Sequence, residues 1–183
     1  VDASEVALIN DIQSLTREIT ARKKGILRAG DLKGCIFGTH LYEPVLHAAK
    51  GSKIQIAPVS LNESEFQFLD DLRLFIEKDQ ARLAAEGIEL FLLRNESRGR
   101  GVGFFEAGNF YPDFLLWLVK DGSQHLAFVE PHGLQHEGPG HKKIEFHQVI
   151  KGIQARLVSE NVILNSFIVT PTRFGRLNWG KTI

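Results

Sequence analysis

Two carboxylates, Asp113 and Glu130, lie on either side of a predicted β-hairpin. The apolar runs to which they belong are joined through Asp121-Gly122, a dipeptide typical of a two-residue hairpin turn because that turn requires positive φ. Counting outward from the turn places Asp113 opposite Glu130, where paired Cβ atoms lie roughly 4.5–5.5 Å apart. Carboxylates this close repel each other, and a divalent cation between them would make the pairing favourable. The oxygen ligands predict Mg²⁺, with Mn²⁺ as a substitute.

Two further residues could join this pair, and each has an ordinary alternative. His132 follows Glu130 by two residues and projects from the same face if the strand continues, but a slip of one residue would turn Glu130 away. In that case Asp113 and Glu130 would be strand-end carboxylates in solvent. Glu65 lies on an apolar helical stripe with Leu69, where an acid is costly unless something pairs with it. Alternatively, Glu65 simply stabilises the N-terminus of its helix.

A metal between the two carboxylates would support one kind of chemistry in particular. A divalent cation lowers the pKa of a bound water and stabilises negative charge at a phosphorus centre. Hydrolysis of a phosphodiester bond requires both actions. A metal held by these residues would therefore be compatible with phosphodiester cleavage.

The elements that must position these residues become regular from residue 61 onward. Residues 1–60 are expected to form an N-terminal helical segment and connector, with an amphipathic helix over 2–22 and a short helix around 43–49. Residues 61–183 are expected to form an α/β domain with a mixed sheet of four or five strands. Its predicted elements are a helix over 61–86 capped by Asn62 or Ser64, strands at 88–93, 113–119 and 125–131, a helix over 141–159 and a last strand at 162–170.

The composition is that of an ordinary globular protein, with 43% hydrophobic and 24% charged residues. The 22 basic and 22 acidic side chains balance, so net charge indicates no partner. One cysteine, Cys35, excludes an internal disulfide, and no apolar run approaches the ~18–20 residues that cross a bilayer. With no visible secretory signal, these features predict a cytoplasmic protein without a membrane partner. The absence of methionine, even at position 1, indicates a piece of a longer polypeptide.

The sequence segments that contain the two acidic residues resemble a known nuclease motif. The run Tyr111-Pro112-Asp113, followed by Glu130-Pro131-His132, resembles the motif of the PD-(D/E)XK nucleases. Five sequence segments around this motif are similar to the C-terminal endonuclease region of the type III restriction enzyme large subunit. They are LYEPVLHAAK, IAPVSLNESEFQFLDDL, GVGFFEAGNFYPDFLLWL, FVEPHGLQH and LNSFIVTP. This resemblance covers nearly the whole chain from about residue 40. It implies a restriction-endonuclease-like core with an N-terminal helical extension, and Mg²⁺-dependent cleavage of double-stranded DNA.

The resemblance also implies a role for individual residues. Asp113 and Glu130 would bind the metal, the backbone carbonyl of Pro131 would be a further ligand, and Glu65 would match the acid on the first core helix. His132 stands where the family usually has a lysine that positions the attacking water. Histidine can donate a hydrogen bond but is mostly neutral at pH 7 when unperturbed, so this departure puts catalytic strength in doubt more than metal binding.

Basic residues elsewhere are candidates for DNA contacts. Lys142 or Lys143, at the start of the following helix, could supply the missing positive charge, although both could equally lie on a solvated helix face. Arg94, Arg98 and Arg100 flank glycines and could contact phosphates, or could belong to an ordinary exposed turn.

The resemblance names partners as well as an activity. The helicase portion of the parent chain and a modification subunit are the expected protein partners, beside double-stranded DNA. The alternative function is a catalytically weakened nuclease-fold module that binds DNA or couples a motor to a partner subunit. The histidine at position 132 is the feature that favours this alternative.

Overall fold

The chain folds as an α/β protein with two compact units, Val1–Lys78 and Asp79–Ile183. The division falls within the long helix α2, Glu63–Ala85. The sequence-based division between residues 60 and 61 stays a prediction. The computed structural model describes residues 3–21, 25–36, 38, 45–51, 56, 60–96, 101–104, 108–134, 136, 138, 140–173 and 176.

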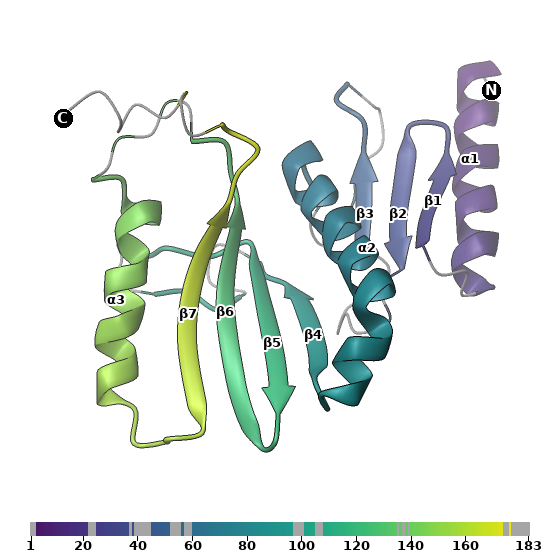
Figure 1. Ribbon diagram of the computed structural model, residues 1–183. Coiled ribbons are helices and arrows are strands. Elements are labelled where there is room, and N and C mark those ends of the chain that lie inside the picture. Colours follow the sequence, from purple (N-terminus) through teal and green to yellow (C-terminus); the bar gives the residue numbers. More distant parts are fainter. Residues whose placement is uncertain are drawn as a thin grey trace. The chain divides into compact units, whose positions relative to one another are not determined.

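The first unit pairs a helix with a small antiparallel sheet (Figure 1). Helix α1, Ala3–Thr20, confirms the helix predicted over 2–22, and its Leu15 packs into a core with apolar residues of the sheet. Alternate strand residues turn to this core, because successive side chains on a strand point to opposite faces. The strands, in the order β1-β2-β3, are β1 (Gly25–Ala29), β2 (Leu32–Ile36) and β3 (Val45–Ala48).

The expected connector between residues 25 and 60 was wrong, because this stretch contains the three strands of that sheet. The short helix expected around 43–49 is wrong over its described part, since Val45–Ala48 pairs with β2. Its side chains alternate between buried Val45 and His47 and partly buried neighbours, which is a strand period. In a run of only four residues, the alternation of a strand cannot be distinguished from one turn of a helix by sequence pattern alone.

The second unit contains the mixed sheet that the sequence predicted (Figure 1). Strand β5 pairs antiparallel with both β4 and β6, whereas β7 runs parallel to β6. The parallel connection passes through helix α3, Lys142–Arg156, as parallel neighbours require a crossover. The strands, in the order β4-β5-β6-β7, are β4 (Glu89–Arg94), β5 (Phe114–Lys120), β6 (Ser123–Pro131) and β7 (Val162–Val169).

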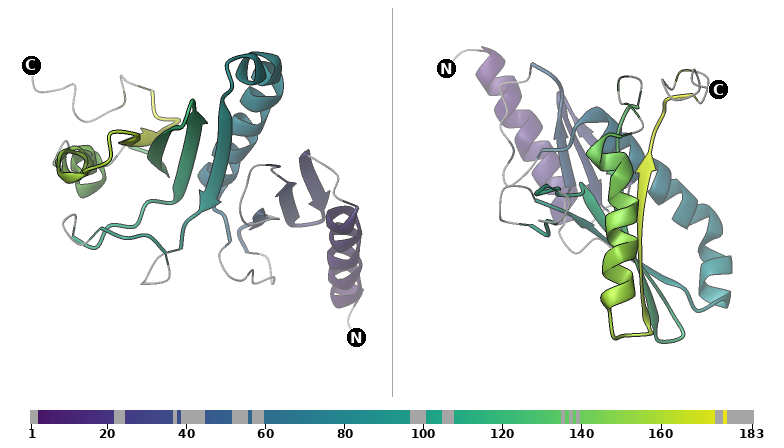
Figure 2. Two further views of the ribbon diagram at one scale, coloured as in Figure 1. Left: turned by 90° about the horizontal axis from the view of Figure 1, so that it is seen from below. Right: turned by 90° about the vertical axis from the view of Figure 1, so that its left-hand side faces the viewer.

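Helix α3 lies beside β7 (Figure 2). An apolar core holds it against the sheet, and polar contacts join it to β7. Phe146 and Ile150 of α3 are buried against Leu115 and Phe128 of the sheet. The side-chain amide of Gln154 donates to the Val162 carbonyl at 2.9 Å and accepts from the Leu164 N–H. Lys151 Nζ donates to the Leu164 carbonyl at 2.7 Å. These bonds satisfy part of the open edge of β7 and fix the C-terminal half of α3 against the start of that strand.

The β5–β6 hairpin has the predicted turn and the predicted register. Asp121 and Gly122 both have positive φ, 50° and 79°, as the Asp-Gly turn requires. Lys120 pairs with Ser123 next to the turn, and Phe114 pairs with Val129 at the far end. The register therefore holds to the last pair before the two carboxylates.

Helix α2 begins and ends close to the predicted residues. Asn62 precedes its first residue, and Gly87, with a φ of 62°, follows its last turn. Of the apolar stripe that the helical period predicts, Phe66, Leu69 and Leu83 are buried, whereas Leu72 and Ile76 are only partly buried. Among the described residues, no helix is both long and apolar enough to cross a membrane.

Candidate active site

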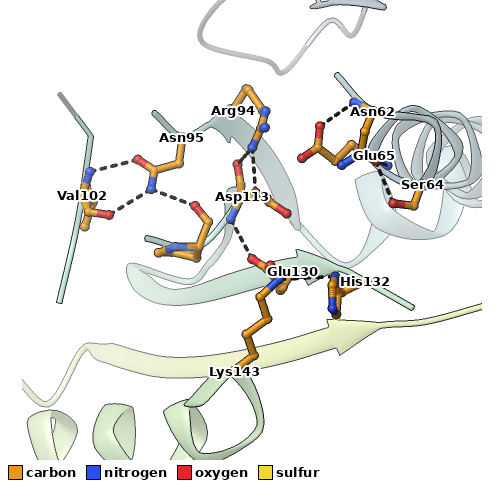
Figure 3. A network of polar contacts seen from close by, with 11 residues as sticks. Asn62, Ser64, Glu65, Arg94, Asn95, Val102, Asp113, Glu130, His132 and Lys143 are labelled. Carbon is orange, nitrogen blue, oxygen red and sulfur yellow. Dashed lines mark hydrogen bonds and ion pairs between the residues drawn. The ribbon is translucent and has the colours of Figure 1, made fainter. Parts of the chain in front are cut away.

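The end of the β5–β6 hairpin brings Asp113 and Glu130 together (Figure 3). Asp113 directly precedes β5 and Glu130 is the penultimate residue of β6. The backbone N–H of Asp113 donates to Glu130 Oε2 at 3.2 Å, so the Glu130 carboxylate is turned toward its partner residue. The pairing that the turn predicted is therefore present in the structure.

Asp113 is fixed from the neighbouring strand by Arg94, the last residue of β4. Arg94 Nη1 donates to the Asp113 carbonyl at 2.6 Å and lies 3.3 Å from its carboxylate Oδ1. The guanidinium also lies over the ring of Phe114, 5.0 Å from its centroid. Only 8% of the Arg94 side chain is exposed, so the interpretation of Arg94 as part of an exposed turn is wrong. This residue is a buried partner of Asp113.

Asn95 ties the segment around Val102 to the residue that precedes Asp113. Its side-chain Nδ2 donates to the carbonyls of Val102 and Pro112, at 2.9 and 2.8 Å, and its Oδ1 accepts from the Val102 N–H. Gly101 is required here, because a Cβ would lie 2.1 Å from the Glu96 carbonyl oxygen. The sequence analysis missed Asn95; an asparagine between a strand and a glycine-rich turn was the available signal. Arg98 and Arg100 lie outside the described residues.

Glu130 is a buried acid with two opposing electrostatic influences. Its exposed fraction is 6%, and Lys143 Nζ forms an ion pair with its Oε1. Burial raises the pKa of Glu130, and the nearby charge of Asp113 raises it further, while Lys143 acts in the opposite direction. The net pKa is raised. The surroundings of the Glu130 carboxylate therefore favour binding of a proton or of a cation.

Lys143 contacts His132 as well as Glu130 (Figure 3). Lys143 Nζ lies 3.3 Å from His132 Nδ1, and since an ammonium can only donate, Nδ1 is the acceptor in this contact. The backbone N–H of His132 donates to Val169, so the strand direction continues to this residue. Lys143 thus links the histidine to the Glu130 carboxylate.

Of the two candidate lysines, the structure selects Lys143 for the contact with Glu130. Lys143 lies in the first turn of α3, and 20% of its side chain is exposed. His141 caps this helix, accepting from the Lys143 N–H at 3.4 Å, and so helps to fix the turn. Lys142 is exposed, as the solvated-face alternative predicted.

Glu65 is buried, with 4% exposed, and has local hydrogen-bond partners. Its Oε2 accepts from the Asn62 N–H at 2.8 Å, while Asn62 Oδ1 accepts from the Glu65 N–H at 2.9 Å and from the Ser64 hydroxyl. This reciprocal pair is a capping box, which satisfies free N–H groups at the start of a helix. The alternative role at the N-terminus of α2 is therefore present. An approach of Glu65 to Asp113 stays a prediction.

The donor atoms at the hairpin end fit a hard divalent cation. Asp113 and Glu130 offer carboxylate oxygens and Pro131 a backbone carbonyl, while the raised pKa of Glu130 shows that further positive charge would be favourable. Mg²⁺ commonly uses one or two carboxylates and completes its shell with water and substrate phosphate. Within the described ranges, no group of three or more His, Cys, Asp or Glu side chains forms a ready-made metal cluster.

Function has to be inferred from these side chains. Comparison of the chain with protein-family models, with curated proteins and with solved structures finds no match. The hairpin end brings Asp113 and Glu130 into contact and places an ammonium against the Glu130 carboxylate. Paired carboxylates and a cation are the groups that metal-assisted attack of water on a phosphate ester uses.

Proposed function

We propose that the chain is a metal-dependent endonuclease domain that hydrolyses phosphodiester bonds of double-stranded DNA. The observation that carries the proposal is the hairpin end, where Asp113 and Glu130 meet and Lys143 contacts Glu130. The resemblance to PD-(D/E)XK nucleases, and to the nuclease region of type III restriction enzymes, supports the same chemistry. A restriction-endonuclease-like arrangement of the mixed sheet is part of the proposal.

Each residue of the site has a part in the proposed reaction. Asp113, Glu130 and the Pro131 carbonyl would hold Mg²⁺ or Mn²⁺, which supplies a bound water of lowered pKa and stabilises charge at phosphorus. Lys143 donates to a phosphate oxygen and neutralises its developing charge. His132 orients Lys143 through Nδ1 and assists the water or the phosphate beside it.

Other residues act around this centre. Arg94 and Asn95 keep Asp113 in place through bonds to its backbone and carboxylate. Glu65 is proposed, from the resemblance, to support the metal. Lys142, Arg98 and Arg100 are proposed phosphate contacts, which position DNA without reading its sequence. The helicase portion of a longer parent chain, a modification subunit and a cytoplasmic location complete the proposal.

Cleavage of supercoiled plasmid by the purified chain tests the proposed function. We expect nicking in Mg²⁺ and Mn²⁺, and a loss of more than ~10³-fold in Asp113→Asn, because loss of even one electrostatic group typically costs ~10²–10³-fold. Asp121→Asn is the matched control, since this exposed acid lies at the other end of the same hairpin and asparagine tolerates positive φ. Equal cleavage by wild type and Asp113→Asn would contradict the assignment.

The alternative function is a nuclease-fold module that binds DNA or couples a motor to a partner without efficient cleavage. It is favoured by the neutralisation of both carboxylates by protein cations, Arg94 at Asp113 and Lys143 at Glu130. A gel-shift assay separates the two functions. Metal-dependent nicking supports the nuclease, whereas tight DNA binding with no nicking by wild type in either metal supports the binding module.

A further inference from the structure

The two carboxylates of the proposed site have protein cations of different mobility. Arg94 is nearly buried, and its guanidinium is fixed by a 2.6 Å bond to the Asp113 backbone and by the ring of Phe114. Lys143 reaches Glu130 from the first turn of α3 on a flexible side chain that is 20% exposed. A lysine stem can change rotamer without disturbing the core, whereas a buried arginine stacked on a ring cannot. Lys143 is therefore the cation that can leave.

We infer that Lys143 is an internal counter-ion of Glu130 that a divalent metal must displace, so that the lysine and the metal compete for one carboxylate. This inference rests on the proposed metal site. Glu130 is buried, and a buried carboxylate without a positive partner is costly. Before metal arrives, Lys143 provides that partner. A dication placed at the same oxygens would lie against the ammonium, and like charges at contact distance repel strongly in a partly buried site.

His132 gives the displaced ammonium an acceptor beside the site. Its Nδ1 already lies 3.3 Å from Lys143 Nζ, so the lysine can release Glu130 and keep this contact. A lysine at position 132, the residue usual in the family that the motif resembles, would place a second positive charge next to Lys143. A histidine can instead accept from that ammonium through Nδ1. The histidine at position 132 is therefore compatible with a lysine at position 143.

Competition of this kind predicts that removing the lysine tightens metal binding even as it harms cleavage. The test measures the heat of Mn²⁺ binding to the 183-residue chain, without DNA and at mildly alkaline pH. We expect Lys143→Met to bind Mn²⁺ about 5- to 150-fold more tightly than wild type, the usual range of coupling between two sites. Lys143→Arg keeps the charge and should bind as weakly as wild type. Lys142→Met, on the exposed neighbour, is the matched control and should not change the affinity.

A labelling experiment on wild type reports on the same exchange without any substitution. Mn²⁺ should increase acetylation of Lys143 by an amine-reactive ester, measured by mass spectrometry, because the ion pair with Glu130 breaks. Lys142 provides the internal reference. Unchanged or weaker Mn²⁺ binding by a folded Lys143→Met, or labelling that Mn²⁺ leaves unchanged, would overturn the inference. Mn²⁺ binding that survives Asp113→Asn in full would instead contradict the proposed metal site.

Discussion

Two buried glutamates, one at the start of α2 and one at the end of the β5–β6 hairpin, are satisfied in different ways. Glu65, 4% exposed, accepts from a backbone N–H three residues earlier and closes a capping box with Asn62. Glu130, 6% exposed, lies against Asp113, 17 residues away in sequence, and is neutralised by Lys143 from another element. The first acid completes a helix; the second is part of a cluster of charges.

This difference shows that burial of an acid is not by itself a sign of function. A capping box satisfies Glu65 with groups that the helix must satisfy in any case. No element needs Glu130 to be an acid: in β6 an apolar residue would pack without a desolvation cost. An acid kept beside a second acid, at a cost to its own ionisation, is the more informative of the two.

The largest expected effect is on cleavage, and it separates the two glutamates. Glu130→Gln should lower plasmid cleavage by more than ~10³-fold, because it removes a charged metal ligand. Glu65→Gln should lower it much less, since one of its oxygens is committed to Asn62 and glutamine can keep that bond. The measurement is the rate of nicking in Mg²⁺, with thermal unfolding to confirm that both variants fold. An equal loss in both would make Glu65 the third acidic residue that the family resemblance implies.

The next effect is on stability, and it concerns the helix cap. Asn62→Ala should lower the free energy of unfolding by about 1 kcal/mol, because it removes the acceptor for the Glu65 N–H and the Ser64 hydroxyl. Urea unfolding followed by circular dichroism provides the measurement. Gln80→Ala, at an exposed position of the same helix, is the control and should stay within ~0.5 kcal/mol. A similarly small change in Asn62→Ala would show that the box contributes little to α2.

The predictable parts of the molecule are those specified by neighbouring residues. Asp121-Gly122 predicted its own turn, and from the turn came the register that pairs Asp113 with Glu130. Asn62 was likewise a recognisable cap, because its partners lie within three residues. The mixed sheet followed from strongly patterned segments of ordinary length. Local chemistry and a period were sufficient for these features.

The parts that could not be predicted depend on contacts between distant elements. Arg94 was read as part of a glycine-rich turn, although the pairing of β4 with β5 makes it a partner of Asp113. The choice of Lys143 over Lys142 depends on the rotation of α3, which its packing on β7 decides. The first sheet was missed because its strands have only four or five residues each. A sequence pattern does not carry that three-dimensional information.

The smallest expected effect is a pH dependence of stability that only Glu130 should produce. Burial and the charge of Asp113 raise its folded-state pKa above the unfolded value of 4.5, against the influence of Lys143. The folded protein therefore binds this proton more tightly than the unfolded chain, so the stabilisation from Glu130 is complete below the unfolded pKa and is lost as pH rises through the folded one. Glu130→Gln cannot lose a proton at this position.

In metal-free buffer, wild type and Glu130→Gln should therefore have similar free energies of unfolding at acidic pH. The variant should become the more stable of the two as the pH rises toward neutrality. Urea titrations across this range measure the difference, with Asp121→Asn as an exposed acid at the other end of the hairpin. Added Mg²⁺ should stabilise wild type and leave Glu130→Gln nearly unchanged, because binding to the folded state alone raises stability by mass action. If wild type instead became more stable relative to Glu130→Gln as the pH rises, Lys143 would outweigh burial in its effect on the pKa of Glu130. Glu130 would then be an acid satisfied by its partners, as Glu65 is.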